Sequence, residues 1–280
     1  MRAIAEFAMR SRVRAVILTL VGIPLISPAV LALVGLRRGS SDGLFVLAWA
    51  ILPLVAAAGY MSPLMAGLAI THFVGVLAGA LVLRATRAWS WALVALTIVS
   101  ALGILVTSQA AGGVLETLTQ AINEAAGGAD TPEAQQLSQA FASEVQATGY
   151  LTWVSVISAV LALLLGRWWQ SLLYNPGGLQ QEMHALRMPL PLAAAGMLLW
   201  VYCLVNEHFV FWGAVAAFPM MVAGICLVHW LVARKGWGRG PLIAMYITLV
   251  IAALPLAGFL CGLALIDSWI DIRARSSDNR

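Results

Sequence analysis

The sequence predicts an all-α protein, a polytopic bundle of transmembrane helices. Hydrophobic residues make up 61% of its 280 positions and charged residues only 10%, whereas soluble domains are about 45–50% apolar and about 25% charged. Long charge-free runs recur along the chain, and the short alternating segments of a membrane β-barrel are absent. So little charge cannot cover a water-facing surface. The composition therefore excludes a soluble enzyme, a disordered protein and a nucleic-acid-binding protein, because the net charge of +4 is spread over the loops.

The charge-free runs define the expected spans, because crossing a bilayer core of about 30 Å takes about 20 mostly apolar residues. Gly43–Leu83 is long enough for two passes, with a break at 59–63. Lipid forces every backbone hydrogen bond to close within its own segment, so each span is helical. We expect about seven full spans in a single integral membrane domain over residues 1–280. The runs are Gly43–Leu83, Ala88–Leu115, Val145–Gly166, Met188–Asn206, His208–Ala233 and Gly240–Ile266.

An earlier apolar run, Ala15–Leu36, is interrupted by Pro24 and Pro28. Two prolines so close together disrupt the helical hydrogen-bond ladder. They favour a hairpin of two short half-helices, whose irregular backbone at membrane depth must be buried in protein or line a cavity. A single proline-kinked helix is the alternative. The preceding arginines resemble the start of a signal peptide, but Arg37 and Arg38 lie just beyond the run and the rest of the chain is equally apolar, so we expect no cleavage.

The basic residues predict the orientation of the bundle, because cytoplasmic loops carry an excess of Arg and Lys. Nine basic residues lie between spans, and the hairpin puts the four N-terminal arginines on the same side as these nine. Only Arg273, Arg275 and Arg280 are then left on the other side, which is why we favour the hairpin. We therefore expect a multi-pass protein of the bacterial inner membrane with its arginine-bearing turns in the cytoplasm.

Residues 109–148 contain five acidic residues and no Arg, Lys or His, and we expect them on the outer face. Leu115, Leu118 and Ile122 recur at helical spacing, and Asp130 followed by Pro132 marks the start of a second helix. This extracytoplasmic insert of two amphipathic helices is expected to act as a lid or a docking surface. A simple connector with a solvated acidic face is the commoner explanation of such a charge run.

The segment 167–189, expected as a cytoplasmic interfacial loop, carries the densest cluster of polar and aromatic residues. Trp and Tyr favour the membrane interface because each combines an apolar ring with a polar edge, and an arginine there can reach lipid phosphate. A turn signal precedes a short helix over 179–187. An aromatic belt with a tight turn explains the aromatic residues but not their polar neighbours. The candidate residues are Arg167, Trp168, Trp169, Gln170, Tyr174, Asn175, Pro176, Gly177, Gly178, Glu182, His184 and Arg187.

Few ionisable residues lie within the expected spans, and each is a candidate site because charge at membrane depth is costly. His72 lies about midway along its span, where a neutral imidazole bonded to a neighbouring helix is the alternative to a ligand or proton role. Asn206, Glu207 and His208 fall in a tight outer turn. There Glu207 either meets a cation, pairs with His208 or is simply solvated. We take these four residues as candidate substrate-binding positions.

No residue pattern predicts catalysis or metal binding. Cys203, Cys226 and Cys261 are isolated within spans and lack metal-ligand spacing, so we interpret them as small packing residues. Zinc spacings, nucleotide-binding glycine motifs and nucleophile elbows are missing. We therefore expect no enzyme activity, no catalytic residue, no metal and no cofactor. Small residues such as Gly213 and Gly224 predict close helix packing.

The run Arg-Trp-Trp-Gln-x-x-Leu-Tyr-Asn-Pro-Gly-Gly over 167–178, followed by Glu-x-His-x-Leu-Arg over 182–187, resembles the proteobacterial branch of the YybS-like family of bacterial membrane proteins. The early turn at Ser27-Pro28 running to 36–39 looks similar too. The resemblance implies an integral membrane protein from a family without an assigned activity. More remotely, the layout is similar to the substrate-capturing subunits of energy-coupling-factor vitamin transporters. This chain departs from those subunits by an extra pair of spans and a long outer insert, and no vitamin-contacting motif carries over.

The sequence leaves two functions open. The first is a small-molecule binding or transport component, with a cavity between helices in which His72 and Glu207 supply polar contacts. The alternative is a scaffold or assembly factor in envelope biogenesis, whose tryptophan-rich inner motif docks another membrane protein. The expected partners are membrane lipids together with a small-molecule substrate or a membrane protein, and not nucleic acid. A polar-lined cavity favours the first function, and exposed, unpaired aromatic residues favour the second.

Overall fold

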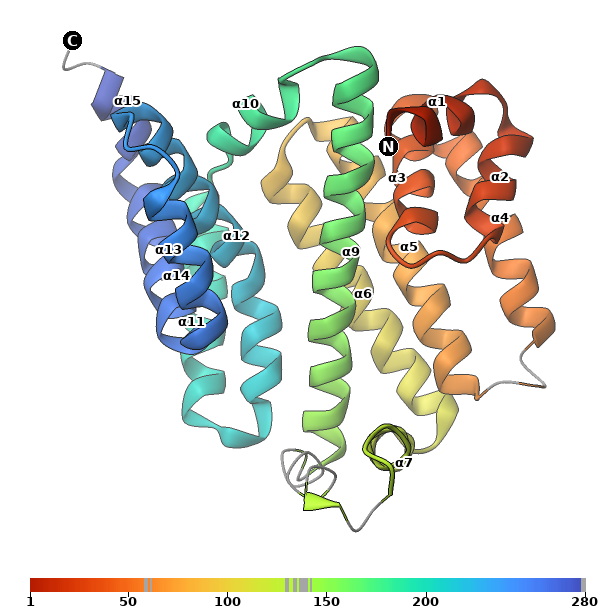
Figure 1. Cartoon of the computed structure of the whole chain (residues 1–280). Coiled ribbons are helices and arrows are strands. Elements are labelled where there is room, and N and C mark those ends of the chain that lie inside the picture. Colours follow the sequence, from red (N-terminus) through yellow and green to blue (C-terminus); the bar gives the residue numbers. More distant parts are fainter. Residues whose placement is uncertain are drawn as a thin grey trace.

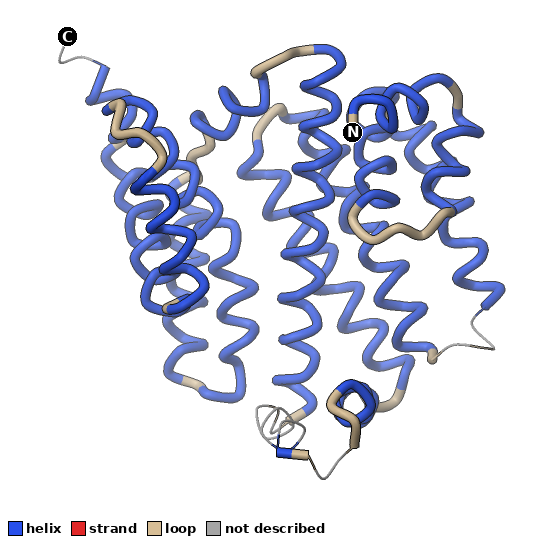
Figure 2. The backbone as a smooth tube through the Cα atoms, in the orientation of Figure 1, coloured by secondary structure: helices blue, strands red, loops and turns tan. Residues whose placement is uncertain are grey.

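The structure of the chain is a computed structural model that describes residues 1–57, 60, 62–128, 131, 132, 135, 141 and 143–277 (Figures 1 and 2). Every regular element in this described part is a helix. Most of the helices lie side by side, and their connections fall mainly at two opposite ends of the bundle (Figure 1). The predicted all-α fold is confirmed.

The first half of the bundle runs from the N-terminus to α6. Side-chain caps fix two of its helix starts, since the N–H of Arg14 donates to Ser11 Oγ and that of Met65 donates to Ser62 Oγ, both at 3.2 Å. Pro63 follows as the first residue of α5, a position that needs no backbone N–H. The elements are α1 (Arg2–Arg10), α2 (Arg12–Leu20), α3 (Ile26–Arg38), α4 (Ser40–Ala56), α5 (Pro63–Thr86) and α6 (Trp89–Ala111).

The second half is joined to the first by α9, the long helix near the middle of Figure 1. This helix packs against α3, α5 and α6 of the first half and against α12 of the second. One apolar core accordingly includes Leu93 of α6, Leu163 of α9 and Met220 of α12. The elements are α7 (Val114–Ala125), α9 (Glu144–Tyr174), α10 (Gly178–Ala185), α11 (Leu190–Val205), η2 (Glu207–Phe209), α12 (Val210–Lys235), α13 (Gly240–Ile251), α14 (Ala253–Ile270) and α15 (Ile272–Ser277).

Within the described residues, five helical stretches are long and apolar enough to cross a membrane: α5, α6, α9, η2 with α12, and α14. The pair α10 and α11 meets the same test together but is bent by 70° at its junction. The apolar helices α4 and α13 are shorter. These lengths support a membrane protein, while the predicted number of about seven full spans is not confirmed.

At the N-terminus, α2 and α3 form an antiparallel pair, as the hairpin interpretation of Ala15–Leu36 expects (Figure 1). The two helices pack against each other, and Ser27 Oγ donates to the Leu18 carbonyl at 3.2 Å across the turn. The turn passes through Gly22 at φ 72° and Leu25 at φ 65°. A single kinked helix would leave α2 and α3 running in the same general direction, so the reversal excludes it.

The C-terminal run Gly240–Ile266, predicted as one span, also contains a reversal and is divided between two helices. α13 ends at Ile251, α14 begins at Ala253, and the two helices lie side by side (Figure 1). The physical reason is Pro255, which has no N–H to donate to the carbonyl four residues earlier and whose ring clashes with that carbonyl. This carbonyl belongs to Ile251, the last residue of α13, so Pro255 favours a break in the helix at this position. A proline alone does not impose such a break, because α12 continues through Pro219.

Because of this reversal, α14 ends at the same end of the bundle as Arg187. Arg187 Nε and Nη2 donate to the carbonyls of Asp267 and Ser268, both at 2.9 Å. The expectation that Arg273 lies on the side opposite the other basic residues is therefore wrong. We call this end the arginine face; α7 and the turn between α11 and α12 lie at the other end (Figure 1). The arginine face includes Arg37, Arg38, Arg84, Arg87, Arg167, Arg187 and Arg273.

The reversal between α13 and α14 predicts the result of cysteine labelling in intact cells that express the protein. If the arginine face is cytoplasmic, as the distribution of basic residues predicts, Arg275→Cys is expected to be protected from a membrane-impermeant maleimide, as is Arg87→Cys, while Glu124→Cys on α7 reacts. The three native cysteines are buried and give little background, and all three introduced thiols should react after permeabilisation. Labelling of Arg275→Cys in intact cells, beside a protected Arg87→Cys, would mean that α14 ends on the opposite side.

α7 corresponds to the first helix expected in the acidic segment 109–148, and its apolar face packs on a small core shared with α5 and α9. Glu144 at the start of α9 accepts N–H bonds from Val114 at 2.7 Å and Leu115 at 2.9 Å. A carboxylate is favourable at the positive end of a helix dipole, so one of the five acids caps α7. The second expected helix, starting at Asp130, lies largely outside the described residues.

Candidate functional site

The polar residues of the arginine face gather around the end of α9. This helix continues to Tyr174, so residues 167–174 are helical and the loop predicted over 167–189 starts only after them. Because successive residues of a helix point in different directions around its axis, the side chains of the motif face three different parts of the structure. Arg167 and Gln170 line a cavity with α3 and α5, Trp168 lines a different cavity with α12, and Trp169 enters the core of the first half. The motif therefore contributes to two cavities instead of one site.

Arg167 pairs with Glu182 of α10. Its Nε donates to Glu182 Oε2 at 3.0 Å and its Nη2 pairs with Oε1, while Trp89 Nε1 also donates to Oε2 at 3.0 Å. Such a two-point arginine–carboxylate contact is strong and directional. The Arg167 side chain is only 10% exposed. Arg167 therefore pairs within the protein, where contact with lipid phosphate was expected. Its pair with Glu182 joins α6, α9 and α10.

The aromatic residues of the motif do not form a simple interfacial belt. Trp169 is fully buried, and its Nε1 has no hydrogen-bond partner among the described residues. Trp168 is partly exposed beside the cavity that it lines. Tyr174 is exposed but carries the guanidinium of Arg37 over its ring, 4.2 Å from the centroid. Only Trp168 and Tyr174 thus occupy positions that suit an interface, and Tyr174 has a cationic partner.

The turn at Asn175-Pro176-Gly177 positions α10 across the arginine face. Gly177 has φ 84°, and Ser171 Oγ donates to the Asn175 carbonyl at 2.7 Å while accepting the Leu179 N–H at 3.3 Å. A Cβ on Gly178 would lie 2.2 Å from Asn175 Nδ2, so a larger residue there would require the Asn175 side chain to move. The predicted short helix over 179–187 corresponds to α10 at Gly178–Ala185.

All three side-chain nitrogens of Arg187 make contacts that join α10 to α14. Beyond its two bonds to carbonyls at the end of α14, its Nη1 pairs with Asp271 Oδ2 at 2.9 Å. Those carbonyls carry the negative end of the helix dipole, which a cation stabilises. Arg187 therefore positions α10 from the C-terminal side, as the pair between Arg167 and Glu182 does from α9.

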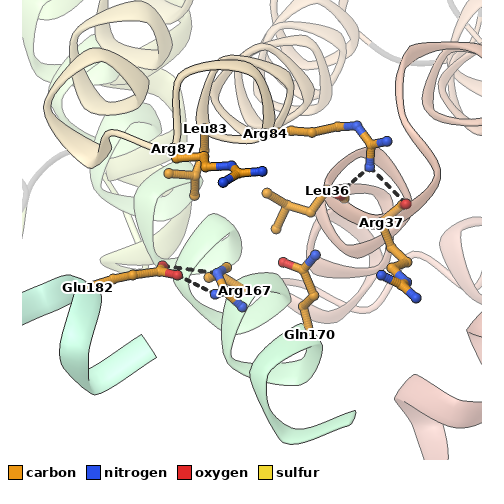
Figure 3. A pocket seen from close by; sticks show the side chains of 8 residues that line it. All are labelled: Leu36, Arg37, Leu83, Arg84, Arg87, Arg167, Gln170 and Glu182. Carbon is orange, nitrogen blue, oxygen red and sulfur yellow. Dashed lines mark hydrogen bonds and ion pairs between the residues drawn. The ribbon is translucent and has the colours of Figure 1, made fainter. Parts of the chain in front are cut away.

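A basic cavity of about 430 Å³ opens beside the Arg167–Glu182 pair (Figure 3). The carbonyls of Leu36 and Arg37 at the end of α3 accept bonds from Arg84 Nη1 of α5, at 2.7 and 2.8 Å. Arg87 follows directly after α5 in a left-handed conformation, with φ 56°. Four guanidinium groups therefore surround one carboxylate. The lining residues are Leu36, Arg37, Leu83, Arg84, Arg87, Arg167, Gln170 and Glu182.

A mainly apolar cavity of about 740 Å³ lies on the other side of the motif, between α9, α10 and α12. Its polar end is formed by His184 of α10 and by His229, whose Nε2 lies 2.8 Å from the hydroxyl of Tyr246 on α13. Burial, and secondly the positive charge of Arg273, lowers the pKa of His184. Arg273 pairs with Asp267 at 2.7 Å, yet its buried Nε and Nη2 have no partner among the described residues.

His72 lines a third cavity, of about 440 Å³, at the tip of the α2–α3 hairpin. The irregular backbone from Gly22 to Leu25 forms one wall, with Ser155 of α9 opposite, which agrees with the expectation that this backbone lines a cavity. Both interpretations of His72, a ligand or proton role and a neutral imidazole bonded to a neighbouring helix, stay predictions.

The turn that contains Asn206, Glu207 and His208 lies apart from His72. Asn206 Nδ2 donates to the Tyr202 carbonyl at 2.8 Å, and Gln146 Nε2 donates to the Glu207 carbonyl at 3.1 Å. The side chains of Glu207 and His208 are exposed, and the cavity of His72 includes none of these three residues. The structure therefore does not join the four predicted substrate-binding residues into one site.

Several residues of the two cavities at the arginine face were not among the predicted site residues. Arg37, Arg84 and Arg87 counted only toward the topology, and His229 was not among the candidates. Their separation along the chain hid the clusters, although the charge at each helix end was visible. Among the described residues, no group of three or more His, Cys, Asp and Glu side chains could hold a metal ion. No family model, curated protein or solved structure matches the chain.

Proposed function

We propose that the chain is a small-molecule binding or transport component of the bacterial inner membrane, which holds an amphipathic solute in the cavity between α9 and α12. The observation that carries this proposal is the division of that cavity into an apolar body and a polar end. The body is lined by side chains such as Leu161, Leu164 and Phe218, and the polar end by His184 and His229. Its volume of about 740 Å³ lies within the range of small-molecule sites, about 300–1,000 Å³.

The chemistry at the polar end favours an anionic head group. His229 and Tyr246 present a hydrogen-bonded pair, and Arg273 affects His184 electrostatically from nearby. An anionic head group entering from the cavity would add acceptors at this end, while an apolar tail would contact the walls between α9 and α12.

The state of the aromatic residues supports this function over a scaffold that docks partners through exposed aromatics. Trp169 is buried, Trp89 donates to Glu182, and Tyr174 lies under Arg37. Trp168 lines the proposed solute cavity. The motif that would dock a partner is therefore occupied by contacts within the chain itself.

We further propose that α4, α5, α6, α9, α11 and α12 cross the inner membrane, and that the pairs α2–α3 and α13–α14 enter and leave it at the arginine face. The excess of Arg over acidic residues at that face supports a cytoplasmic location. The solute cavity then opens near the cytoplasmic interface, where an amphipathic molecule can keep its head group in a polar environment.

A cavity-filling substitution tests the proposed solute site. Val222→Trp adds a large side chain to the cavity wall, and we expect crosslinking of the purified protein by a photoreactive long-chain fatty acid to fall at least about tenfold, the effect of about 1.4 kcal/mol in affinity. Excess unlabelled fatty acid should compete with the crosslink. The readout is the amount of label on peptides of α9 and α12.

The matched control is Val250→Trp, since Val250 lies on the exposed surface of α13, with 85% of its surface accessible. This variant should keep the crosslinking of the unmodified protein. Equal labelling of the two variants, or label spread over all lipid-facing helices without competition, would show that the fatty acid only coats the apolar surface and that the cavity is not a solute site.

A further inference from the structure

The basic cavity between α3, α5, α9 and α10 is not used by the proposed solute site. It is formed where three helix ends meet at the arginine face, and in Figure 3 the side chains of Arg37, Arg84, Arg87 and Gln170 gather around it. Arg37 and Arg84 belong to α3 and α5, Arg87 follows α5, and Gln170 belongs to α9. The positive-inside rule accounts for arginines in inner loops, but it does not require them to converge on one cavity.

The charges around this cavity are not balanced. Glu182 is the only acidic residue in the lining, and it is engaged by Arg167. Among the described residues, no carboxylate lies within ion-pair distance of Arg37, Arg84 or Arg87. These three positive charges line one cavity of about 430 Å³ and repel one another. An anion bound between them would turn this repulsion into attraction.

The guanidinium of Arg84 and the backbone of Arg87 are held in place before any ligand binds. Arg84 Nη1 is fixed by the carbonyls of Leu36 and Arg37, which orient the guanidinium without neutralising it. The backbone of Arg87 is fixed by its N–H bond to the Leu83 carbonyl at 2.8 Å. Guanidinium groups present several donors in a rigid plane that matches the oxygens of a phosphate. The cavity is therefore preorganised for an anion with several acceptor oxygens.

We propose that this cavity binds a phosphate group through Arg37, Arg84, Arg87 and Gln170. The same chemistry suits the head group of an anionic phospholipid and a free phosphorylated solute. Basic pockets between transmembrane helices at the cytoplasmic side are well suited to phospholipid head groups. This site is separate from the proposed fatty-acid-like solute cavity, so one of the two proposals can fail while the other holds.

Thermal stabilisation of the detergent-purified full chain tests the phosphate site. Cardiolipin and inorganic phosphate are titrated separately, and the concentration at half of the maximal shift in Tm is measured. Arg87→Gln and Arg37→Gln are each expected to raise this concentration about tenfold, the size of one lost charge-assisted hydrogen bond. Arg87→Lys, which keeps the charge but not the planar fork, should give a smaller increase. Without ligand, Arg87→Gln should have a Tm no lower than that of the original protein, because it removes one of the charges that repel one another.

Arg239→Gln is the matched control, because Arg239 is an exposed arginine of the same face outside the cavity. Its titration should be unchanged. Stabilisation by cardiolipin alone identifies a lipid head group as the ligand, and stabilisation by inorganic phosphate that competes with cardiolipin identifies a free phosphate. Absence of stabilisation by both probes, or an equal loss in Arg239→Gln, overturns the proposal, because the arginines would then act only as general surface charge.

Discussion

Replacing Gly224 by alanine is expected to destabilise the second half of the bundle strongly. An added Cβ would lie 2.3 Å from the Leu260 carbonyl oxygen and 2.8 Å from its carbon. Overpacking of a core usually costs about 1–3 kcal/mol, and here the obstacle is backbone, which cannot rotate away as a side chain can. We therefore expect the upper end of that range, measured as a fall in Tm of the protein in detergent.

The control for this prediction is Gly262→Ala on α14, where nothing lies within 4 Å of an added Cβ. Alanine is favoured over glycine within a helix by roughly 0.5–1 kcal/mol, so this variant should be unchanged or slightly more stable. If both variants lose the same stability, or Gly224→Ala loses none, then α12 and α14 are not in the close contact that the structure gives.

Glu182→Gln is the second substitution for which we expect a large effect. The amide can still accept the bond from Trp89, but it removes the negative charge that faces Arg167, whose side chain is 10% exposed. An arginine left without its counter-ion in such a place is costly, and three further arginines line the same cavity. Because Glu182 is 32% exposed, we expect a loss of about 2–4 kcal/mol, at or below the range for a fully buried pair.

Two variants separate the charge effect from general damage in this prediction. Glu6→Gln removes the exposed pair with Arg2, which lies on the surface of α1, and such a pair contributes at most about 0.5 kcal/mol. Trp89→Phe removes one hydrogen bond to Glu182 and also leaves a cavity, because Trp89 is buried in the core. It therefore measures a loss of packing in which the charge pair is kept. A loss in Glu182→Gln no larger than in Glu6→Gln, measured by thermal unfolding, would mean that the pair does not hold α10 in place.

The sequence predicts the long helices of the bundle because a helix that crosses lipid must be apolar over about 20 residues. α5, α6, α9 and α12 each follow a charge-free run, and charges lie close to their ends at the arginine face. The same rule did not reveal the reversal within Gly240–Ile266, where length alone suggested one span. Pro255 was the available signal, since its missing N–H favours a break there, but Pro219 lies within the continuous helix α12. Charge spacing defines where apolar segments lie, but it does not say whether the chain crosses or turns back.

The candidate site was harder to predict from the sequence than the helices were, for a physical reason. A helix in a soluble protein reveals its buried side by an apolar stripe, whereas the spans here are apolar on all sides. The sequence therefore does not fix how each helix is rotated about its axis. Arg167 was assigned to lipid although its partner Glu182 lies in the same motif, and Arg84 gave no sign that it meets the carbonyl of Leu36. Such contacts depend on helix rotation.

The reversals at both ends of the chain have a consequence for how the protein enters the membrane. α1 and α15 both lie at the arginine face and α7 lies at the opposite end (Figure 1). α7 belongs to the segment 109–148, which carries acidic residues and no lysine or arginine. On the proposed orientation, biosynthesis exports negative charge and retains positive charge. An inside-negative electrical potential supplies about 2.3 kcal/mol per exported negative charge per 100 mV. The energised membrane thus assists insertion of this chain in the orientation that keeps its arginines inside.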